Sequence, residues 1–210
     1  MTPEYYRGVC FWVATEKVAD CLAPTVYCDY TQFGSDKNHP HAGIDRGVFK
    51  EDVFGYIRFD CSGWDKKGPK FTDLLEFVAI YEHYQGIRRW SRSKFCQRNI
   101  NYMNLGNKVR GHLFSASFAE CREREIDEMI ESISKHGVSA YSFEKDPNKY
   151  VDNISVCLGR EGDLFFNNRG HHRLSIAKIL GIRYVPLKVT VAHNVTVLRD
   201  FASVGCYEFN

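Results

Sequence analysis

The residues most able to do chemistry lie between Asn168 and Leu180, in the sequence NRGHHRLSIAKIL. A glycine, two histidines and an arginine stand here, where the pattern predicts that a loop turns into an amphipathic helix. The first turn of a helix leaves backbone N–H groups without partners, and the helix dipole places partial positive charge there. The side chains of His171, His172 and Arg173 at such a position therefore predict an anion site, with phosphate as the simplest ligand.

The two histidines do not have to play the same part. Neighbouring residues of a helix point about 100° apart, so one ring can face a ligand while the other packs or caps. Two acids, Glu161 and Asp163, stand in a predicted hairpin turn shortly before the loop. Either carboxylate could coordinate Mg²⁺ or orient a nucleophile, and an ordinary polar turn is the alternative explanation.

A second candidate region is the stretch 86–102, which reads GIRRWSRSKFCQRNINY. Arg88, Arg89 and Arg92 alternate here with Trp90, and the basic pattern continues to Arg98. Basic side chains interleaved with aromatic rings can hold phosphates and stack bases, which predicts a nucleic-acid or acceptor site. The alternative is an amphipathic helix with a solvated basic face and a buried aromatic face.

Hydrophobic periodicity places these candidates on a small set of elements. Helical spacing of apolar residues predicts helices over 71–85, 118–136 and 171–180. Gly137 and Gly181 follow the last two of these helices, where a left-handed residue commonly ends a helix. Alternating and continuous apolar runs predict strands over 154–158, 164–167 and 184–192.

The order and spacing of five pieces resemble the ParB/sulfiredoxin superfamily over residues 132–193. The pieces are a helix end, a strand, a hairpin, a glycine loop and a final strand, at Glu131–Gly137, Ile154–Leu158, Gly159–Phe166, Gly170–Arg173 and Val185–Val189. The resemblance implies an α+β fold with a small mixed sheet and flanking helices over 110–195. We expect residues 1–109 to form an integral N-terminal extension and residues 196–210 a C-terminal tail.

The resemblance also implies roles for the loop. In that superfamily it binds nucleotide phosphates in sulfiredoxins, in ParB proteins that use CTP, and in ParB-like kinases. Carried over, Gly170 allows close approach of the backbone, and His172 and Arg173 contact phosphate oxygens. His171 stands where sulfiredoxins have their cysteine, so the thiol chemistry is excluded. Arg169 replaces an acid that is frequent in the kinase-like members and adds a cation.

Three functions follow from these candidates. The first is a nucleotide-phosphate-binding protein that catalyses phosphoryl transfer or hydrolysis of ATP or CTP. Its catalytic residues would be Glu161, Asp163 and His171, with Mg²⁺ held by the two acids. The second is a ParB-like nuclease or regulator that holds DNA or RNA through Arg88–Arg98. The third is a non-catalytic sensor that binds a nucleotide in the same loop.

Composition narrows the class of protein. The chain has 210 residues, of which 44% are hydrophobic, and a formal net charge of +2, so nucleic-acid binding would require a local patch. Its eight cysteines form no CxxC pair, which favours buried thiols in a reducing compartment. No apolar run reaches the roughly 18–20 residues that span a bilayer, and no signal peptide is recognisable. We expect a soluble, intracellular, cytoplasmic protein without a membrane partner.

Overall fold

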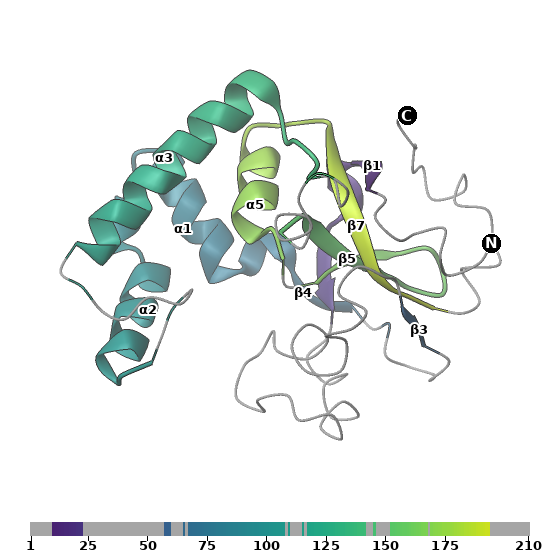
Figure 1. Cartoon of the computed structure of the whole chain (residues 1–210), viewed down its shortest axis with the longest axis horizontal. Helices are drawn as coiled ribbons and strands as arrows, with labels where there is room; N and C mark the ends of the chain where they lie inside the picture. The colour runs from purple at the N-terminus through teal and green to yellow at the C-terminus, as the bar shows by residue number, and fades with distance from the viewer. Residues whose placement is uncertain are drawn as a thin grey trace.

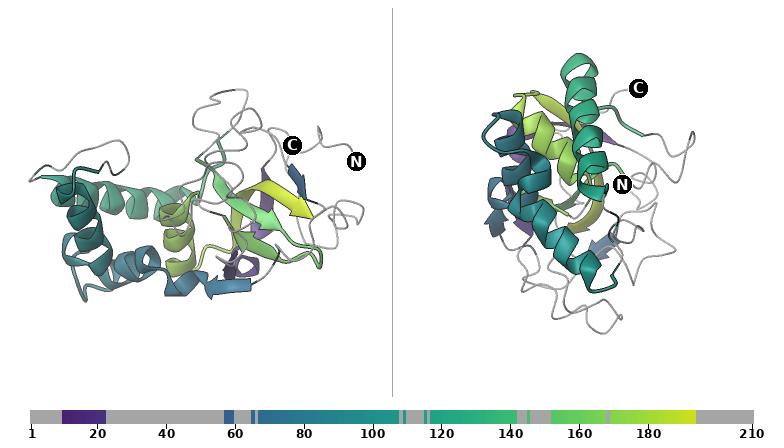
Figure 2. Two further views of the ribbon diagram at one scale, coloured as in Figure 1. Left: turned by 90° about the horizontal axis from the view of Figure 1, so that it is seen from below. Right: turned by 90° about the vertical axis from the view of Figure 1, so that its left-hand side faces the viewer.

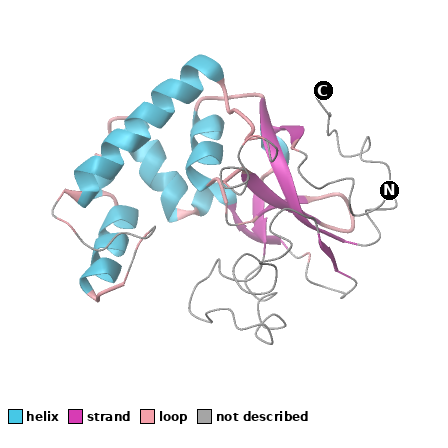
Figure 3. Cartoon of the chain, in the orientation of Figure 1, coloured by secondary structure: helices cyan, strands magenta, loops and turns pink. Residues whose placement is uncertain are grey.

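The computed structural model describes residues 10–22, 57–59, 65, 67–107, 109, 115, 117–141, 145, 152–167 and 169–193. Figures 1 and 3 show that the strands gather on one side of the molecule and the α-helices on the other. The strands are β1 (Phe11–Ala14), β2 (Asp20–Leu22), β3 (Ile57–Phe59), β4 (Lys67–Lys70), β5 (Ile154–Leu158), β6 (Leu164–Phe166) and β7 (Tyr184–His193). The described α-helices are α1 (Leu75–Tyr84), α2 (Lys94–Asn104), α3 (Phe118–His136) and α5 (His171–Ile179).

The strands form one mixed sheet in the order β1-β7-β5-β6-β2-β4, and β3 pairs with β7. β7 is parallel to β5 along one edge, while its other edge carries β1 in its first half and β3 at its end. β2 is parallel to β6 and antiparallel to β4. Strands from the first 70 residues therefore flank the three C-terminal strands within a single sheet.

The core lies between this sheet and the helices. Ile154, Val156 and Leu158 alternate along β5 and belong to the same buried cluster as Leu174 and Ile176 of α5. α5 packs on β5 and contacts both α1 and α3, and α2 packs on α1 (Figure 2). Because α5 lies between the sheet and the other helices, its amino end is fixed relative to β5.

The expectation of an α+β fold with a mixed sheet and flanking helices is confirmed. α3 has the expected bounds, and Gly137 ends it with a φ of 71°. The helix expected over 71–85 is divided, because a 3₁₀ turn, η4 (Phe71–Asp73), precedes α1 and Leu74 between them is extended. The expected tail at 196–210 lies outside the described residues.

Candidate functional site

The loop that leads into α5 is packed directly on the first residues of β5. The backbone N–H of Asn167 donates to the Ser155 carbonyl at 2.8 Å, and the Ser155 N–H donates to the Arg169 carbonyl at 3.2 Å. Gly170 has a φ of 79°, and a Cβ at this position would lie 2.7 Å from the Ile154 Cα. Only glycine fits both the left-handed backbone and this close approach. The fold itself therefore requires Gly170, whether or not the loop binds a ligand.

Arg173 is held in place by backbone carbonyls and an aromatic ring. One guanidinium nitrogen donates to the Asp152 carbonyl at 3.2 Å, and another donates to the Ser139 carbonyl. The guanidinium carbon lies 4.6 Å from the centre of the Tyr141 ring, which is a cation–π contact. Burial lowers the pKa of this guanidinium, although arginine keeps its charge in proteins. Among the described residues, Arg173 forms no ion pair with a carboxylate.

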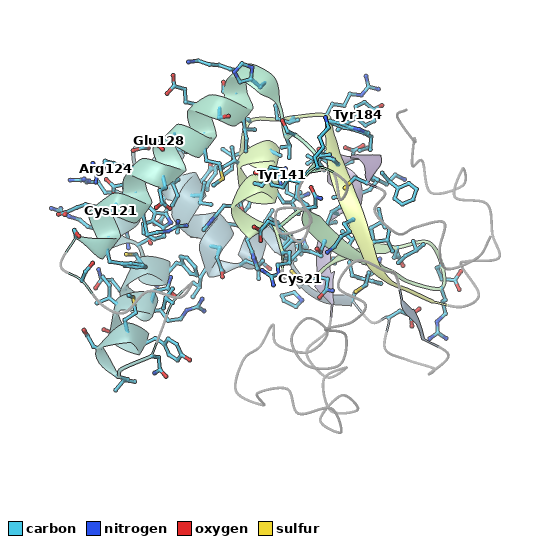
Figure 4. The ribbon with its side chains drawn as sticks, viewed as in Figure 1. Cys21, Cys121, Arg124, Glu128, Tyr141 and Tyr184 are labelled. Carbon is cyan, nitrogen blue, oxygen red and sulfur yellow. The ribbon has the colours of Figure 1, made fainter. Side chains whose placement is uncertain are left out.

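The segment that carries Tyr141 is tied to the start of β5 by a second contact. The Asn153 side chain accepts a hydrogen bond from the Tyr141 N–H and donates one to the Tyr141 carbonyl, each at 2.9 Å. Figure 4 labels Tyr141, which lies beside α5. Arg173 and Asn153 together join the chain after α3 to the strand and helix that form the site.

Arg169 contributes a second positive charge at this end of α5. Its guanidinium lies 3.6 Å from the Asp152 carboxylate, and the two side chains are 39% and 61% exposed. Asp152 therefore touches both arginines, through its carboxylate on Arg169 and through its backbone carbonyl on Arg173.

The histidine rings pack against aromatic rings of different elements. The His171 ring centre lies 4.6 Å from that of Phe166 on β6, and the His172 ring centre lies 6.5 Å from that of Phe95 on α2. His172 is buried, whereas His171 is partly exposed. The Nε2 atoms of both rings are buried, and His171 is the more exposed residue of the two. The expected phosphate contact of His172 stays a prediction.

The structure does not bring the two candidate acids to this loop. β5 and β6 are antiparallel, with Leu158 opposite Leu164 beside the turn and Val156 opposite Phe166 towards the loop. Glu161 and Asp163 therefore lie at the other end of the hairpin from His171, roughly 13 Å away along the strand. The expectation that these acids share a site with the loop is not met, because the hairpin separates them.

No metal centre is formed by the residues that the structure describes. They contain no group of three or more histidine, cysteine, aspartate or glutamate side chains that could hold an ion. Asp163 instead lies 3.6 Å from the Lys67 ammonium group. A Mg²⁺ ion bound by Glu161 and Asp163 would therefore have no third histidine, cysteine, aspartate or glutamate ligand among the described residues.

An ion pair that the sequence analysis did not single out dominates the hairpin turn. Arg160 donates to Asp65 through its backbone N–H at 2.8 Å and through two guanidinium nitrogens at 2.5–3.1 Å. These hydrogen bonds lower the pKa of Asp65 to about 2. The Asp65 side chain is only 5% exposed. The two residues are 95 positions apart, so no local spacing signals the pair.

Side chains of the basic stretch 86–102 pack against the helices and do not line an open groove for a nucleic acid. Trp90 is 1% exposed and packs against Phe95, so its ring is not available to stack on a base. Arg89 donates to the buried Glu123 of α3 at 2.7 Å, and the Ser91 N–H donates to the same carboxylate.

The other arginines of this stretch show a similar pattern. Arg88 lies 3.4 Å from Glu82 and Arg98 lies 3.6 Å from Glu76, while Arg92 is exposed. Trp90 and Phe95 are buried while the charged side is solvated, as the amphipathic alternative describes, although Tyr102 is 47% exposed.

Comparisons with known proteins do not assign a family. No protein-family model, no curated protein and no solved structure matches this chain. None of the helices in the described ranges is long and apolar enough to cross a membrane. The function must therefore be argued from the geometry of the site.

Proposed function

We propose that this chain binds a phosphate-bearing ligand, first of all a nucleotide, at the amino end of α5. The observation that carries the proposal is the position of Arg173. Its guanidinium is held beside the first turn of α5 by two carbonyls and the Tyr141 ring, with no carboxylate paired to it among the described residues. A partly desolvated positive charge next to the positive end of a helix dipole favours an anion.

Two further cations strengthen the positive potential at this end of the helix. Arg169 precedes Gly170 and is 39% exposed. Lys188 on β7 is buried and lies opposite Ser155 of β5. Burial raises the pKa of the Cys10 thiol to about 11, and the charges of Lys188 and Arg173 both oppose this rise. Lys188 and Arg173 therefore both lie near the Cys10 thiol.

Phosphate suits this arrangement better than a simple carboxylate does. Guanidinium groups donate paired hydrogen bonds to phosphate oxygens, and backbone N–H groups of a first helical turn add more. The order of α3, β5, β6, the glycine loop, α5 and β7 supports a ParB/sulfiredoxin-like module as part of this proposal. ATP or CTP are the nucleotides that this likeness suggests.

Phosphoryl transfer or hydrolysis is the enzymatic extension of the proposal. The partly exposed His171 at the first turn of α5 is the residue that we assign as its general base. Any Mg²⁺ would arrive with the nucleotide, since magnesium is commonly held by substrate phosphates and only one or two carboxylates. A sensor that binds without turnover would use the same residues, and single-turnover assays separate the two.

Titration calorimetry with ATP, CTP, ADP and inorganic phosphate tests the binding step. We expect Arg173→Ala to weaken nucleotide binding by about 1.5–3 kcal/mol, the range for a lost charge-assisted hydrogen bond. Arg183→Ala is the matched control, because Arg183 also lies over a tyrosine ring, Tyr184, but follows the carboxyl end of α5. The Arg183→Ala variant should bind nucleotide with the affinity of the wild type.

Arg173→Lys separates the charge from the structural contacts. Lysine keeps the charge but cannot span two carbonyls as guanidinium does. We expect this variant to retain more affinity than Arg173→Ala, with circular dichroism and thermal unfolding confirming that both are folded. Absence of binding to the wild type at millimolar concentrations of every probe would contradict the proposed function.

A further inference from the structure

We propose that Asp152 is an internal competitor of the ligand, and that its carboxylate sets the affinity and the charge preference of the phosphate site. The inference rests on the proposed function, because it concerns the same two arginines. Asp152 forms the ion pair with Arg169 and also accepts a hydrogen bond from Arg173 through its carbonyl. A phosphate that reaches Arg169 must therefore displace this carboxylate or bind beside it.

The geometry of the pair shows that the carboxylate is loosely held. The shortest distance from Arg169 is 3.6 Å, which is longer than a hydrogen bond, and 61% of the Asp152 side chain is exposed. The Asp65–Arg160 pair differs in every respect, with contacts of 2.5–3.1 Å and an aspartate that is 5% exposed. Asp152 can rotate into solvent at little cost, whereas Asp65 cannot.

The backbone of Asp152 is fixed although its carboxylate is loose. Arg173 holds the Asp152 carbonyl, and the next residue, Asn153, is fully buried and bonded to Tyr141. The carboxylate therefore stays tethered near both arginines whenever it leaves Arg169. Its negative charge lowers the local electrostatic potential, and the energy that this costs a bound anion is largest for the most highly charged anions.

This arrangement makes a specific prediction about ligand charge. Replacement of Asp152 by asparagine removes the charge and keeps the size of the side chain. We expect Asp152→Asn to bind ATP roughly threefold to tenfold more tightly than the wild type does, and AMP with a smaller gain, because ATP carries more negative charge. The gain should shrink in high salt, where exposed charges are screened.

The experiment compares four proteins by calorimetry with ATP and AMP in the presence of EDTA. They are the wild type, Asp152→Asn, Asp152→Glu and Asp163→Asn. Asp152→Glu restores the charge and should return the affinity to near the wild-type value. Asp163→Asn is the matched control, since Asp163 is also an exposed aspartate 3.6 Å from a cation, Lys67, but belongs to the hairpin turn. It should bind as the wild type does.

Each outcome bears on the inference. Tighter ATP binding by Asp152→Asn, rescued by Asp152→Glu, supports it. Equal or weaker binding by Asp152→Asn while the wild type binds would overturn the inference and leave the proposed function standing. A third outcome is that Asp152→Asn binds ATP no more tightly than the wild type in EDTA and more weakly than the wild type in Mg²⁺. Asp152 would then be a metal ligand and not a competitor. No binding by either protein would overturn both the inference and the proposed function.

Discussion

The two ends of the β5–β6 hairpin hold their charges in opposite ways. At the turn, Arg160 and Asp65 make a short, multiply bonded pair with a nearly buried carboxylate. At the other end, Arg169 lies 3.6 Å from the exposed carboxylate of Asp152, and Arg173 donates to the backbone carbonyl of the same residue. The first arrangement neutralises charge and fixes a turn, whereas at the second end the Arg173 guanidinium is held by two carbonyls and a ring, with no carboxylate bonded to it among the described residues. The comparison separates a structural ion pair from a candidate binding site.

Glycine is used at both ends, but the contacts that require it differ. A Cβ at Gly159 would meet the Phe165 ring at 2.8 Å and Asp65 at 3.4 Å, which are side-chain atoms. A Cβ at Gly170 would meet the Ile154 backbone, which cannot rotate away. The end of the hairpin that carries the Gly170 loop is therefore the less tolerant of the two.

The largest effect should come from Gly170→Ala. The variant must adopt a positive φ and push against the Ile154 backbone, which together should cost roughly 3–5 kcal/mol of unfolding free energy. Chemical denaturation measures this loss. Gly181→Ala is the control, because Gly181 has a similar φ of 67° at the other end of α5 but no atom lies within 4 Å of its Cβ position. An equal loss in the two variants would show that packing on β5 is unimportant.

Asp65→Asn should have the next largest effect, about 1–3 kcal/mol, because it removes a carboxylate that accepts charge-assisted hydrogen bonds. The pKa of Asp65 falls from 3.8 to about 2 on folding. The pair therefore stabilises the protein fully above pH 4, and this contribution disappears as the pH falls from 4 towards 2.

Denaturation curves recorded between pH 2 and pH 6 test whether the stability falls as the pH is lowered, as expected for Asp65. The wild type should lose stability over that interval more steeply than Asp65→Asn, so the two proteins converge at the acid end. A constant difference between them at all pH values would mean that Asp65 does not titrate as the structure indicates.

The sequence allowed much of the helix and strand pattern to be predicted, since that pattern depends on local periodicity. α3 with Gly137 and the order of β5, β6, α5 and β7 are examples. The flanking strands β2 and β4 could not be assigned, because β4 reads KGPK with no apolar residue and β2 has only three residues. Their places depend on pairing with β6, which is remote in sequence.

The candidate site was predictable only as a segment. The loop at 169–173 is local, so its glycine and cations were found from the sequence. The partners of those side chains are not local: Arg173 is bonded to Ser139, which is 34 positions away, and His172 packs on Phe95 of another helix. The sequence did not indicate a role for Asp152, because that role depends on two arginines that lie close to it only in the folded protein.

The smallest effect should come from Asp163→Asn in the hairpin turn. Asp163 and Lys67 are 45% and 62% exposed and lie 3.6 Å apart, so their ion pair should contribute less than about 0.5 kcal/mol to stability. Thermal unfolding measures this difference, and it should shrink further in high salt. The same variant also tests the metal role expected for Asp163 from the sequence. A large loss of Mg²⁺-dependent nucleotide binding would place the chemistry at the turn, and so reverse the assignment of the two ends of the hairpin.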